Sequence, residues 1–467
     1  MTAQPPSPIL LAAYWGPEIR NMVFSGLIRR LVQDRPVVLL SRVIDGDFVK
    51  HLPADCSLVQ LPIIRIPGYL SRLSTLANRA HGVWMDRTGM MRALEGRAGE
   101  GLHAATTAKR IRNNLGSLMA SRTAVEGLTA VESAALRFSG AACPHLRELI
   151  RRWKPGAFLS MDSVHPSAAL MACLARRAGG RSFFCSGNWK DVGRGFRARP
   201  CFDQFLVWND QMRRDLLRQN PRLASRKVRS VGASQFDLLR HPEFIETREA
   251  FCARFALAPA RLLLCYTCAA RRVIPHESAT IRDICRSIAR HEIAGDPYLL
   301  VRLNPTGSDP QIERLAAEFD FVRISAPAWD YRPSLAGGPW QASDYEDLII
   351  YASMIRHAAA NLSAPSTVIL DFAVADKPVV NVGYDPPGMD VAGRSVGTFA
   401  KQDVFQSAVN LSACRLAGRP EELRGHLNAY LHCPDLDRAG RLSFVREQLG
   451  SDPRPAAARI ADVLLES

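Results

Sequence analysis

Short apolar segments alternate with helical patterns along the first half of the chain. Segments of strand length occupy residues 9–14, 36–40, 56–61, 157–161, 182–185, 204–207 and 227–231. Apolar residues recur at helical spacing in the intervals, for example over residues 22–33 and 210–217. A strand–helix–strand order implies parallel strands joined by right-handed crossovers. We therefore predict an open parallel α/β sheet for residues 1–231.

The same alternation starts again after a break. Predicted strands cover residues 261–266, 298–303, 321–325, 357–362 and 378–382, with helices over 279–291, 311–319, 345–353 and 366–374. The 467 residues exceed the ~250–300 at which a single hydrophobic core stops growing. We expect two doubly wound, Rossmann-like domains that face one another: residues 1–231, a linker 232–258, residues 259–440, and a helical tail 441–467. Ligands of such sheets bind beyond the carboxyl ends of the strands.

Residues from about 70 to 150 interrupt the pattern of the first domain. They show helical spacing, lack strand signals and predict two or three amphipathic helices inserted in that domain. Basic residues collect there: Arg72, Arg79, Arg87, Arg92, Arg97, Lys109, Arg110, Arg112 and Arg122. A solvated basic face explains this enrichment most simply, and contact with an anionic membrane surface or acceptor is the alternative.

Composition and charge narrow the class of protein. Hydrophobic residues make up 47% and charged residues 22%, as in ordinary globular proteins. The net charge of +15 attracts polyanions such as nucleic acid, anionic lipid or phosphorylated substrates. No helix-turn-helix, RNP or zinc-finger pattern is present, so nucleic acid is not an expected partner.

The sequence favours a cytoplasmic protein, with peripheral contact at the inner membrane face as a further expectation. No apolar run approaches the ~20 residues of a membrane span, and no basic segment precedes the short apolar run at the N-terminus. The eleven cysteines are scattered and odd in number, which argues against a disulfide framework. Cys265 and Cys268 have CxxC spacing but no second pair nearby, so buried thiols are favoured over zinc or redox chemistry.

The segment 357–385 carries the strongest functional signal. Ser366 and Thr367 stand where a helix is predicted to begin, beside Ser363 and ahead of Asp371. Unpaired N–H groups and the helix dipole favour a phosphate group at such a position. A plain helix N-cap explains the two hydroxyl groups equally well.

Four parts of the sequence carry a resemblance to a known family. Asn361-Leu-Ser-Ala-Pro-Ser-Thr-Val-Ile-Leu-Asp-Phe-Ala-Val-Ala-Asp-Lys-Pro-Val-Val resembles the donor-site segment of GT-B glycosyltransferases of the bacterial surface-polysaccharide type, and is most similar to the branch with the CDP-glycerol glycerophosphotransferases. Val301-Arg302-Leu-Asn304-Pro305 is similar to the Arg-x-His-Pro element of that branch. The segment 205–209 with 231–237 resembles the end of its N-terminal domain, and residues 186–191 resemble its Ser-Trp-Asp-Asn loop in composition. Asparagine at 304 replaces the usual histidine, which makes glycerophosphotransfer doubtful.

The resemblance and the strand-end positions imply roles for individual residues. Arg302 is the best candidate to neutralise a donor pyrophosphate, because a guanidinium group binds phosphate oxygens bidentately, and a salt bridge within the fold is its alternative. Further donor-binding candidates are Tyr266, Thr267, Asn304, Ser363, Ser366, Thr367, Asp371 and Glu346. Acceptor-binding candidates are Trp15, Asn188 and Asp191.

Transfer to a hydroxyl group also requires a base. Asp162 follows a predicted strand directly and is our first choice, with His165 and Glu18 behind it, although Asp162 serves equally well as a helix N-cap. The class stabilises the leaving phosphate with helix dipoles and basic side chains. The resemblance therefore implies no metal, and no cofactor beyond the nucleotide-activated donor.

We accordingly expect a glycosyltransferase that moves a sugar from a nucleotide-sugar donor to a saccharide or lipid-linked acceptor in surface polysaccharide biosynthesis. A CDP-polyol phosphotransferase of the same fold is one alternative. A nucleotide-sugar 2-epimerase shares the two-domain arrangement, but it requires more carboxylates around the sugar than the sequence predicts. A non-catalytic protein that binds nucleic acid or another polyanion is the alternative outside enzymes.

Overall fold

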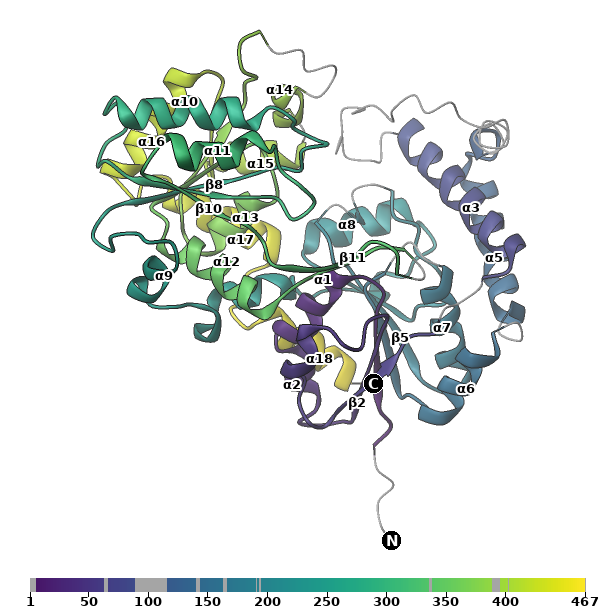
Figure 1. Cartoon of the computed structure of the whole chain (residues 1–467). Coiled ribbons are helices and arrows are strands. Elements are labelled where there is room, and N and C mark those ends of the chain that lie inside the picture. Colours follow the sequence, from purple (N-terminus) through teal and green to yellow (C-terminus); the bar gives the residue numbers. More distant parts are fainter. Residues whose placement is uncertain are drawn as a thin grey trace.

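The chain folds into two α/β domains joined by a linker (Figure 1). The structure, a computed structural model, describes residues 6–62, 66–88, 116–139, 143–162, 166–189, 191–192, 195–335, 338–388, 395–401 and 403–466. Within these ranges it contains a seven-stranded sheet, a six-stranded sheet and a two-stranded hairpin. The expected pair of doubly wound domains is thereby confirmed.

The N-terminal sheet is parallel throughout, in the order β3-β2-β1-β4-β5-β6-β7. Its strands are β1 (Ile9–Ala13), β2 (Val37–Ser41), β3 (Cys56–Gln60), β4 (Ala157–Ser160), β5 (Arg181–Cys185), β6 (Gln204–Val207) and β7 (Val228–Ser230). The central strands β1, β2 and β4 are buried at every position, because helices cover both faces of a parallel sheet. The strand order changes direction between β1 and β4, where such sheets bind ligands.

Helices connect these strands. They are α1 (Gly16–Ile19), the π-helical turn η1 (Arg20–Phe24), α2 (Leu27–Leu31), η2 (Asp47–His51), α3 (Gly68–Arg87), α5 (Arg122–Ser139), α6 (Pro144–Trp153), α7 (Pro166–Arg177) and α8 (Asp210–Gln219). The single helix expected over residues 22–33 is wrong: Gly26, at φ +83°, separates η1 from α2. A left-handed residue ends a helical turn, and glycine adopts it without a steric penalty.

The predicted helical insertion is present in its described parts. Helices α3 and α5 pack against each other around Ala77, Ala80, Val125 and Leu128, and lie on the side of the N-terminal domain away from the C-terminal domain (Figure 1). Arg92, Arg97, Lys109, Arg110 and Arg112 lie outside the described residues.

The C-terminal sheet is also parallel, in the order β10-β9-β8-β13-β14-β15. Its strands are β8 (Leu263–Thr267), β9 (Tyr298–Arg302), β10 (Val322–Ser325), β13 (Ala360–Ser363), β14 (Val379–Val382) and β15 (Arg415–Ala417). The helices are α10 (Glu277–Ala289), α11 (Gln311–Glu318), α12 (Tyr345–His357), α13 (Val368–Val374), α14 (Val396–Ala400), α15 (Asp403–Asn410) and α16 (Pro420–His432). The strand predicted from His357 begins only at Ala360, because His357 still belongs to α12. The helix predicted from Ser366 begins at Val368.

A hairpin that the sequence analysis did not anticipate extends from the C-terminal domain onto the N-terminal one. Strands β11 (Trp329–Arg332) and β12 (Trp340–Ser343) pair antiparallel, and β12 packs on α1 (Figure 1). Arg332 forms an ion pair with Asp45 at 2.7 Å, and Arg42 donates a hydrogen bond to the Gly338 carbonyl oxygen. The hairpin therefore covers the loop that follows β1.

The linker and the C-terminal helices also connect the two domains. The linker contains η6 (Ser234–Arg240), η7 (Pro242–Phe244) and α9 (Arg248–Arg254), and the chain ends with α17 (Arg438–Leu449) and α18 (Ala456–Leu465). Helix α18 packs on α2 and η6, and the Asp237 carboxylate accepts hydrogen bonds from the backbone N–H groups of Ala456 and Ala457. One continuous core of buried apolar residues runs from the N-terminal domain into the C-terminal one.

The hairpin contact predicts a specific sensitivity at Gly16. A Cβ atom there would lie 1.6 Å from the Gln341 carbonyl oxygen, so Gly16→Ala forces the backbones apart. We expect the thermal midpoint to fall by roughly 2–12 °C, since overpacking costs about 1–3 kcal/mol and each kcal/mol is worth about 2–4 °C in a domain of this size.

Gly82→Ala is the matched control for this substitution. Nothing lies within 4 Å of a Cβ atom at Gly82 in α3, and alanine favours a helix, so its midpoint should hold or rise. Equal midpoints for Gly16→Ala and the wild type in differential scanning calorimetry would contradict the contact.

Candidate functional site

The loops at the carboxyl ends of β1 and β4 bring acidic side chains together beside the C-terminal domain. Glu18 in α1 is buried, and its Oε2 atom accepts hydrogen bonds from the backbone N–H groups of Tyr14, at 2.5 Å, and Trp15, at 3.0 Å. Burial raises the pKa of Glu18 well above its usual range, and the negative charge of Asp162 raises it further. Glu18 therefore both caps the first turn and holds a proton more firmly than an exposed glutamate.

Asp162, directly after β4, is the second member of this acidic group. Only 3% of it is exposed, and its negative charge reaches both Glu18 and Tyr14, whose hydroxyl group lies 3.2 Å from Met171 Sδ. Asp191 also lies within electrostatic reach of Glu18. The structure thus brings three of the predicted residues together: Glu18, Asp162 and Asp191. We call them the acidic cluster.

The other residues that were predicted to belong to the site in the N-terminal domain differ in their exposure and contacts. Trp15 is half-buried below the hairpin, with the Arg42 guanidinium 5.7 Å from its ring centre. Asn188 is exposed, and its backbone N–H donates to Asp191 Oδ2 at 3.1 Å. His165 lies outside the described residues. Contact with an acceptor stays a prediction for Trp15, Asn188 and Asp191.

Arg302, the predicted pyrophosphate ligand, is engaged inside the C-terminal domain. Its Nη2 atom lies 2.7 Å from both carboxylate oxygens of Asp347, and its Nη1 atom donates to Ser325 Oγ at 3.0 Å. Only 7% of Arg302 and 2% of Asp347 are exposed. Asp347 also accepts from the Trp329 indole N–H, so the pair fixes the base of the hairpin. The salt bridge that was the alternative for Arg302 is what the structure shows.

Several residues that were predicted to bind the nucleotide-activated donor make hydrogen bonds within the C-terminal domain instead. The Tyr266 hydroxyl donates to Glu277, Thr267 bonds to Asn361, and the Ser363 hydroxyl donates to Asn381. Tyr266, Thr267 and Ser363 are all buried. The Asn304 side chain stabilises a turn by accepting from Thr306, and exposed Glu346 pairs with Arg254 of the linker. These contacts give each residue a structural role. That these residues bind the nucleotide-activated donor stays a prediction.

The segment before α13 presents its polar groups between the domains. Thr367 is exposed, Ser366 is half-buried, and neither hydroxyl caps the helix. Asp371 accepts a hydrogen bond from the Tyr351 hydroxyl at 3.1 Å and faces the positive charge of Arg20 from the N-terminal domain. Burial raises the pKa of Asp371 to about 6, against the opposing effects of Arg20 and Tyr351.

Arg20 and Tyr351 are residues that the sequence analysis missed. Arg20 follows Glu18 by two positions in the first βα loop, and its Nη2 atom donates to Gln235 in the linker at 3.0 Å. A basic residue in a loop already expected to face the ligand was the available signal. Arg20 and Asp371 lie within electrostatic reach of each other across the domain boundary. Together with the acidic cluster, Ser366 and Thr367 they define the interdomain site.

Three further properties of the described residues bear on the site. Across these ranges, no group of three or more His, Cys, Asp or Glu side chains is arranged to hold a metal ion. No helix in the described part of the chain has the length and apolar character needed to cross a membrane. All eleven cysteines are free, including Cys265 and Cys268.

Known structures share this arrangement. The UDP-GlcNAc 2-epimerase from Neisseria meningitidis, bound to UDP-GlcNAc, matches over 98% of this chain and 99% of its own, with 11% identity and a TM-score of 0.53. The UDP-GlcNAc 2-epimerase from Methanocaldococcus jannaschii matches over 98% and 99%, with 12% identity and a TM-score of 0.51. The chain has the GT-B fold. No protein-family model and no curated protein matches the sequence.

In a GT-B protein the two sheets face each other through their strand-end loops, and the interdomain site occupies that position here. The electrostatic reach between Arg20 and Asp371 and the hairpin contact with α1 connect the two sets of loops. The likeness covers both domains and the linker. At 11–12% identity it identifies the fold, whereas the function has to be argued from the site.

The buried pair in the C-terminal domain predicts a large loss of stability for Arg302→Met. Removal of one partner from a buried ion pair costs about 3–5 kcal/mol, because the remaining charge is left without compensation. Arg286→Met, which breaks an exposed pair with Asp283, should cost less than about 1 kcal/mol. Urea unfolding followed by circular dichroism measures both. A stable Arg302→Met variant that loses only nucleotide binding would instead favour the phosphate role.

The raised pKa of Asp371 predicts a pH-dependent stability. A free aspartate titrates near 4, so between about pH 4 and 6 the folded state binds the proton more tightly than the unfolded state. The free energy of unfolding therefore falls as pH rises through this window, and Asp371→Asn should remove that part of the fall. Urea midpoints at pH 4.5, 6.0 and 7.5 test this, with exposed Asp435→Asn as the control. Parallel pH curves for all three proteins would contradict it.

Proposed function

We propose that the interdomain site binds a nucleotide-activated sugar and transfers the sugar to an acceptor hydroxyl group. The observation that carries this proposal is the acidic cluster at the strand ends of one domain, together with Arg20 of the same loops and Asp371 of the other domain within electrostatic reach of each other. A neighbour in fold binds UDP-GlcNAc, which supports a nucleotide sugar as the donor. Surface polysaccharide assembly is the context that the sequence resemblance suggests.

Arg20 is our candidate to contact the donor diphosphate in place of Arg302. It is half-buried at the domain boundary, and its neighbour Asp371 holds its proton up to about pH 6 and is ionised above that value. A guanidinium group binds phosphate oxygens through two parallel hydrogen bonds. Ser366 and Thr367 contribute hydroxyl donors on the opposite side.

Asp162 and Glu18 take the proton-transfer roles in this proposal. Asp162 is buried directly after β4, at the carboxyl end of that strand, and a carboxylate in this position accepts the proton of an attacking hydroxyl group. Glu18, with its raised pKa, stays protonated at higher pH and donates a hydrogen bond to the reacting sugar or leaving group. No step in this scheme requires a metal ion.

Epimerisation of a nucleotide sugar is a second candidate, favoured by one observation. The sequence alone predicts too few carboxylates around the sugar for such a reaction, but the structure brings both Asp162 and Asp191 within electrostatic reach of Glu18. Inversion at a C–H centre by proton removal and return requires acid and base groups near one carbon atom. Solvent deuterium at the sugar carbon therefore distinguishes epimerisation from transfer.

The test is nucleotide binding combined with turnover. We expect one of UDP, GDP, CDP and ADP to raise the thermal midpoint, by about 2.7 kcal/mol of stabilisation at a hundredfold excess over its dissociation constant. Asp162→Asn should keep that shift but lower turnover of the matching nucleotide sugar by about 10²–10⁴-fold. Arg20→Gln should weaken nucleotide binding, and exposed Asp296→Asn should change neither.

The outcomes separate the candidates. Free nucleotide with a glycosylated acceptor supports transfer. An isomerised donor carrying deuterium from D₂O, without any acceptor, supports epimerisation. Absence of a midpoint shift with all four nucleotides would refute the proposal.

A further inference from the structure

A second pocket lies in the N-terminal domain, beside the helical insertion. It has a volume of about 270 Å³ and lies between α3, α5 and the segments that precede β6 and β7. Residues 198–202 and 220–227 enter the amino-terminal ends of those strands, whereas the interdomain site lies at carboxyl-terminal strand ends. Helices α3 and α5 lie on the far side of this domain from the C-terminal domain (Figure 1). The pocket is therefore separate from the interdomain site.

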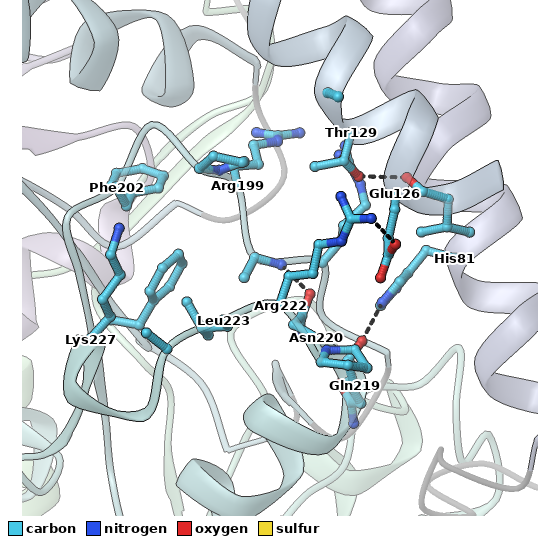
Figure 2. A pocket seen from close by; sticks show the side chains of 18 of the residues that line it. His81, Glu126, Thr129, Arg199, Phe202, Gln219, Asn220, Arg222, Leu223 and Lys227 are labelled. Atoms are coloured by element: carbon cyan, nitrogen blue, oxygen red, sulfur yellow. Dashed lines mark hydrogen bonds and ion pairs between the residues drawn. The ribbon is translucent and has the colours of Figure 1, made fainter. Parts of the chain in front are cut away.

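Apolar side chains form most of the pocket wall. Figure 2 shows Phe202 and Leu223 on one side, and His81 with Thr129 from the insertion on the other. Further lining residues are Trp84, Val125, Ala130, Ala198, Pro200 and Phe205. An engineered apolar cavity of about 150 Å³ binds benzene, so this volume holds an apolar group on the order of ten carbon atoms.

Hydrogen bonds and ion pairs keep the wall in place. His81 is 1% exposed, and its ring nitrogens lie 3.1 Å from the Gly195 carbonyl oxygen and 3.0 Å from that of Gln219. Arg197 forms a buried ion pair with Glu132 of α5 at 2.5 Å. The insertion is thus attached to the loops that complete the pocket, and the cavity is a fixed feature of the fold.

Basic groups dominate the charged part of the lining. Arg197, Arg199, Arg222 and Lys227 line the pocket, against Glu126 as its acidic residue. Arg222 pairs with Glu126 at 2.7 Å, and Arg197 and Arg199 share the carboxylate of Glu132 behind the wall, which still leaves an excess of positive charge. Charge complementarity therefore favours an anionic ligand.

The hydrogen-bond donors without partners differ in whether a ligand in the pocket can reach them. Arg197 is 7% exposed and Gln219 1% exposed, yet Arg197 Nη2 and Gln219 Nε2 have no hydrogen-bond partner among the described residues. Neither of these two atoms has surface accessible to the cavity, so a ligand oxygen in the pocket contacts neither of them. The Lys227 ammonium group, half-buried at the same pocket, also has no partner within the described ranges.

We propose that this pocket binds an amphiphile with one anionic head group and an alkyl chain of about ten carbons. The chain fills the apolar volume between Trp84, Val125 and Phe202, and the head group lies at the basic part of the lining, where it accepts a hydrogen bond from the half-buried Lys227 ammonium group. A carboxylate and a phosphate monoester share the required chemistry. This site is independent of the proposed transferase function.

Calorimetric titration of the full chain with alkyl phosphates below their micelle concentrations tests the proposal. We expect one decyl phosphate to bind per chain. From hexyl to decyl phosphate the affinity should rise about fourfold for each added methylene, and dodecyl phosphate should gain less because the pocket is then full. Decyltrimethylammonium should bind more weakly than decyl phosphate, because its charge has the wrong sign.

Variants on α5 locate the binding site. Ala130 lines the pocket and is exposed, so Ala130→Trp fills the pocket without altering the core. This substitution should lower the affinity for decyl phosphate at least about tenfold, which corresponds to the loss of about two buried methylene groups. Val131→Trp is the matched control, because Val131 is 57% exposed on the same helix and does not line the pocket. This variant should bind decyl phosphate with the affinity of the wild type.

A charge variant tests the head-group contact. Lys227→Gln should lower the affinity for decyl phosphate about threefold and leave the affinity for decanol unchanged. Arg290→Gln, at an exposed position, should change neither affinity. Dodecyl and decyl phosphates that bind the Ala130→Trp variant as tightly as the wild type would overturn the proposal. So would tighter binding of the cationic amphiphile, or no saturable binding of decyl phosphate. Each of these results is independent of whether the chain transfers a sugar.

Discussion

The close approach of two backbones at Gly16 is the constraint on which the interdomain site depends. The Gln341 carbonyl oxygen occupies the space that any Cβ atom at Gly16 would need. This contact places the hairpin of the C-terminal domain directly on the loop that carries Glu18 and Arg20, and the buried Arg302–Asp347 pair holds the base of the hairpin. A local requirement for glycine thereby fixes how the two sets of strand-end loops meet.

The electrostatics of the site follow from this arrangement. Three carboxylates gather at the carboxyl ends of strands in the N-terminal domain. Burial of Glu18, together with the negative charges of the other two, favours its protonated form. Across the boundary, Arg20 opposes the rise of the Asp371 pKa, which burial nevertheless takes to about 6. The site therefore combines a group that holds a proton, carboxylates nearby, and a guanidinium group at the domain boundary. Transfer of a sugar between oxygen atoms needs these elements, and so does inversion at a sugar carbon.

The sequence was sufficient for the alternating architecture because strand and helix periodicities reflect local burial, and β6 was predicted to the residue. The sequence was insufficient to predict the parts of the structure that depend on contacts between residues far apart in the chain. The two strands of the hairpin, Trp329–Arg332 and Trp340–Ser343, alternate apolar and polar residues over only four positions each, and the hairpin is stabilised by Gly16, Arg42 and Asp45, far away in sequence. Arg302 stands at a strand end, as predicted, but its partner Asp347 is 45 residues away, and no local pattern reveals that pairing. Glu18 and Asp162 were found because strand-end positions converge by topology alone.

Hydrogen–deuterium exchange of the full chain, with and without the nucleotide that raises its thermal midpoint, tests the central claim most directly. If the two domains form one site, the nucleotide will slow exchange in both the β1–α1 loop, residues 14–20, and the segment 363–371 before and within α13. Residues 198–202 and 220–227, which border the second pocket, will exchange as before. Protection confined to one domain, or to the second pocket, would contradict the claim that the nucleotide binds between the domains.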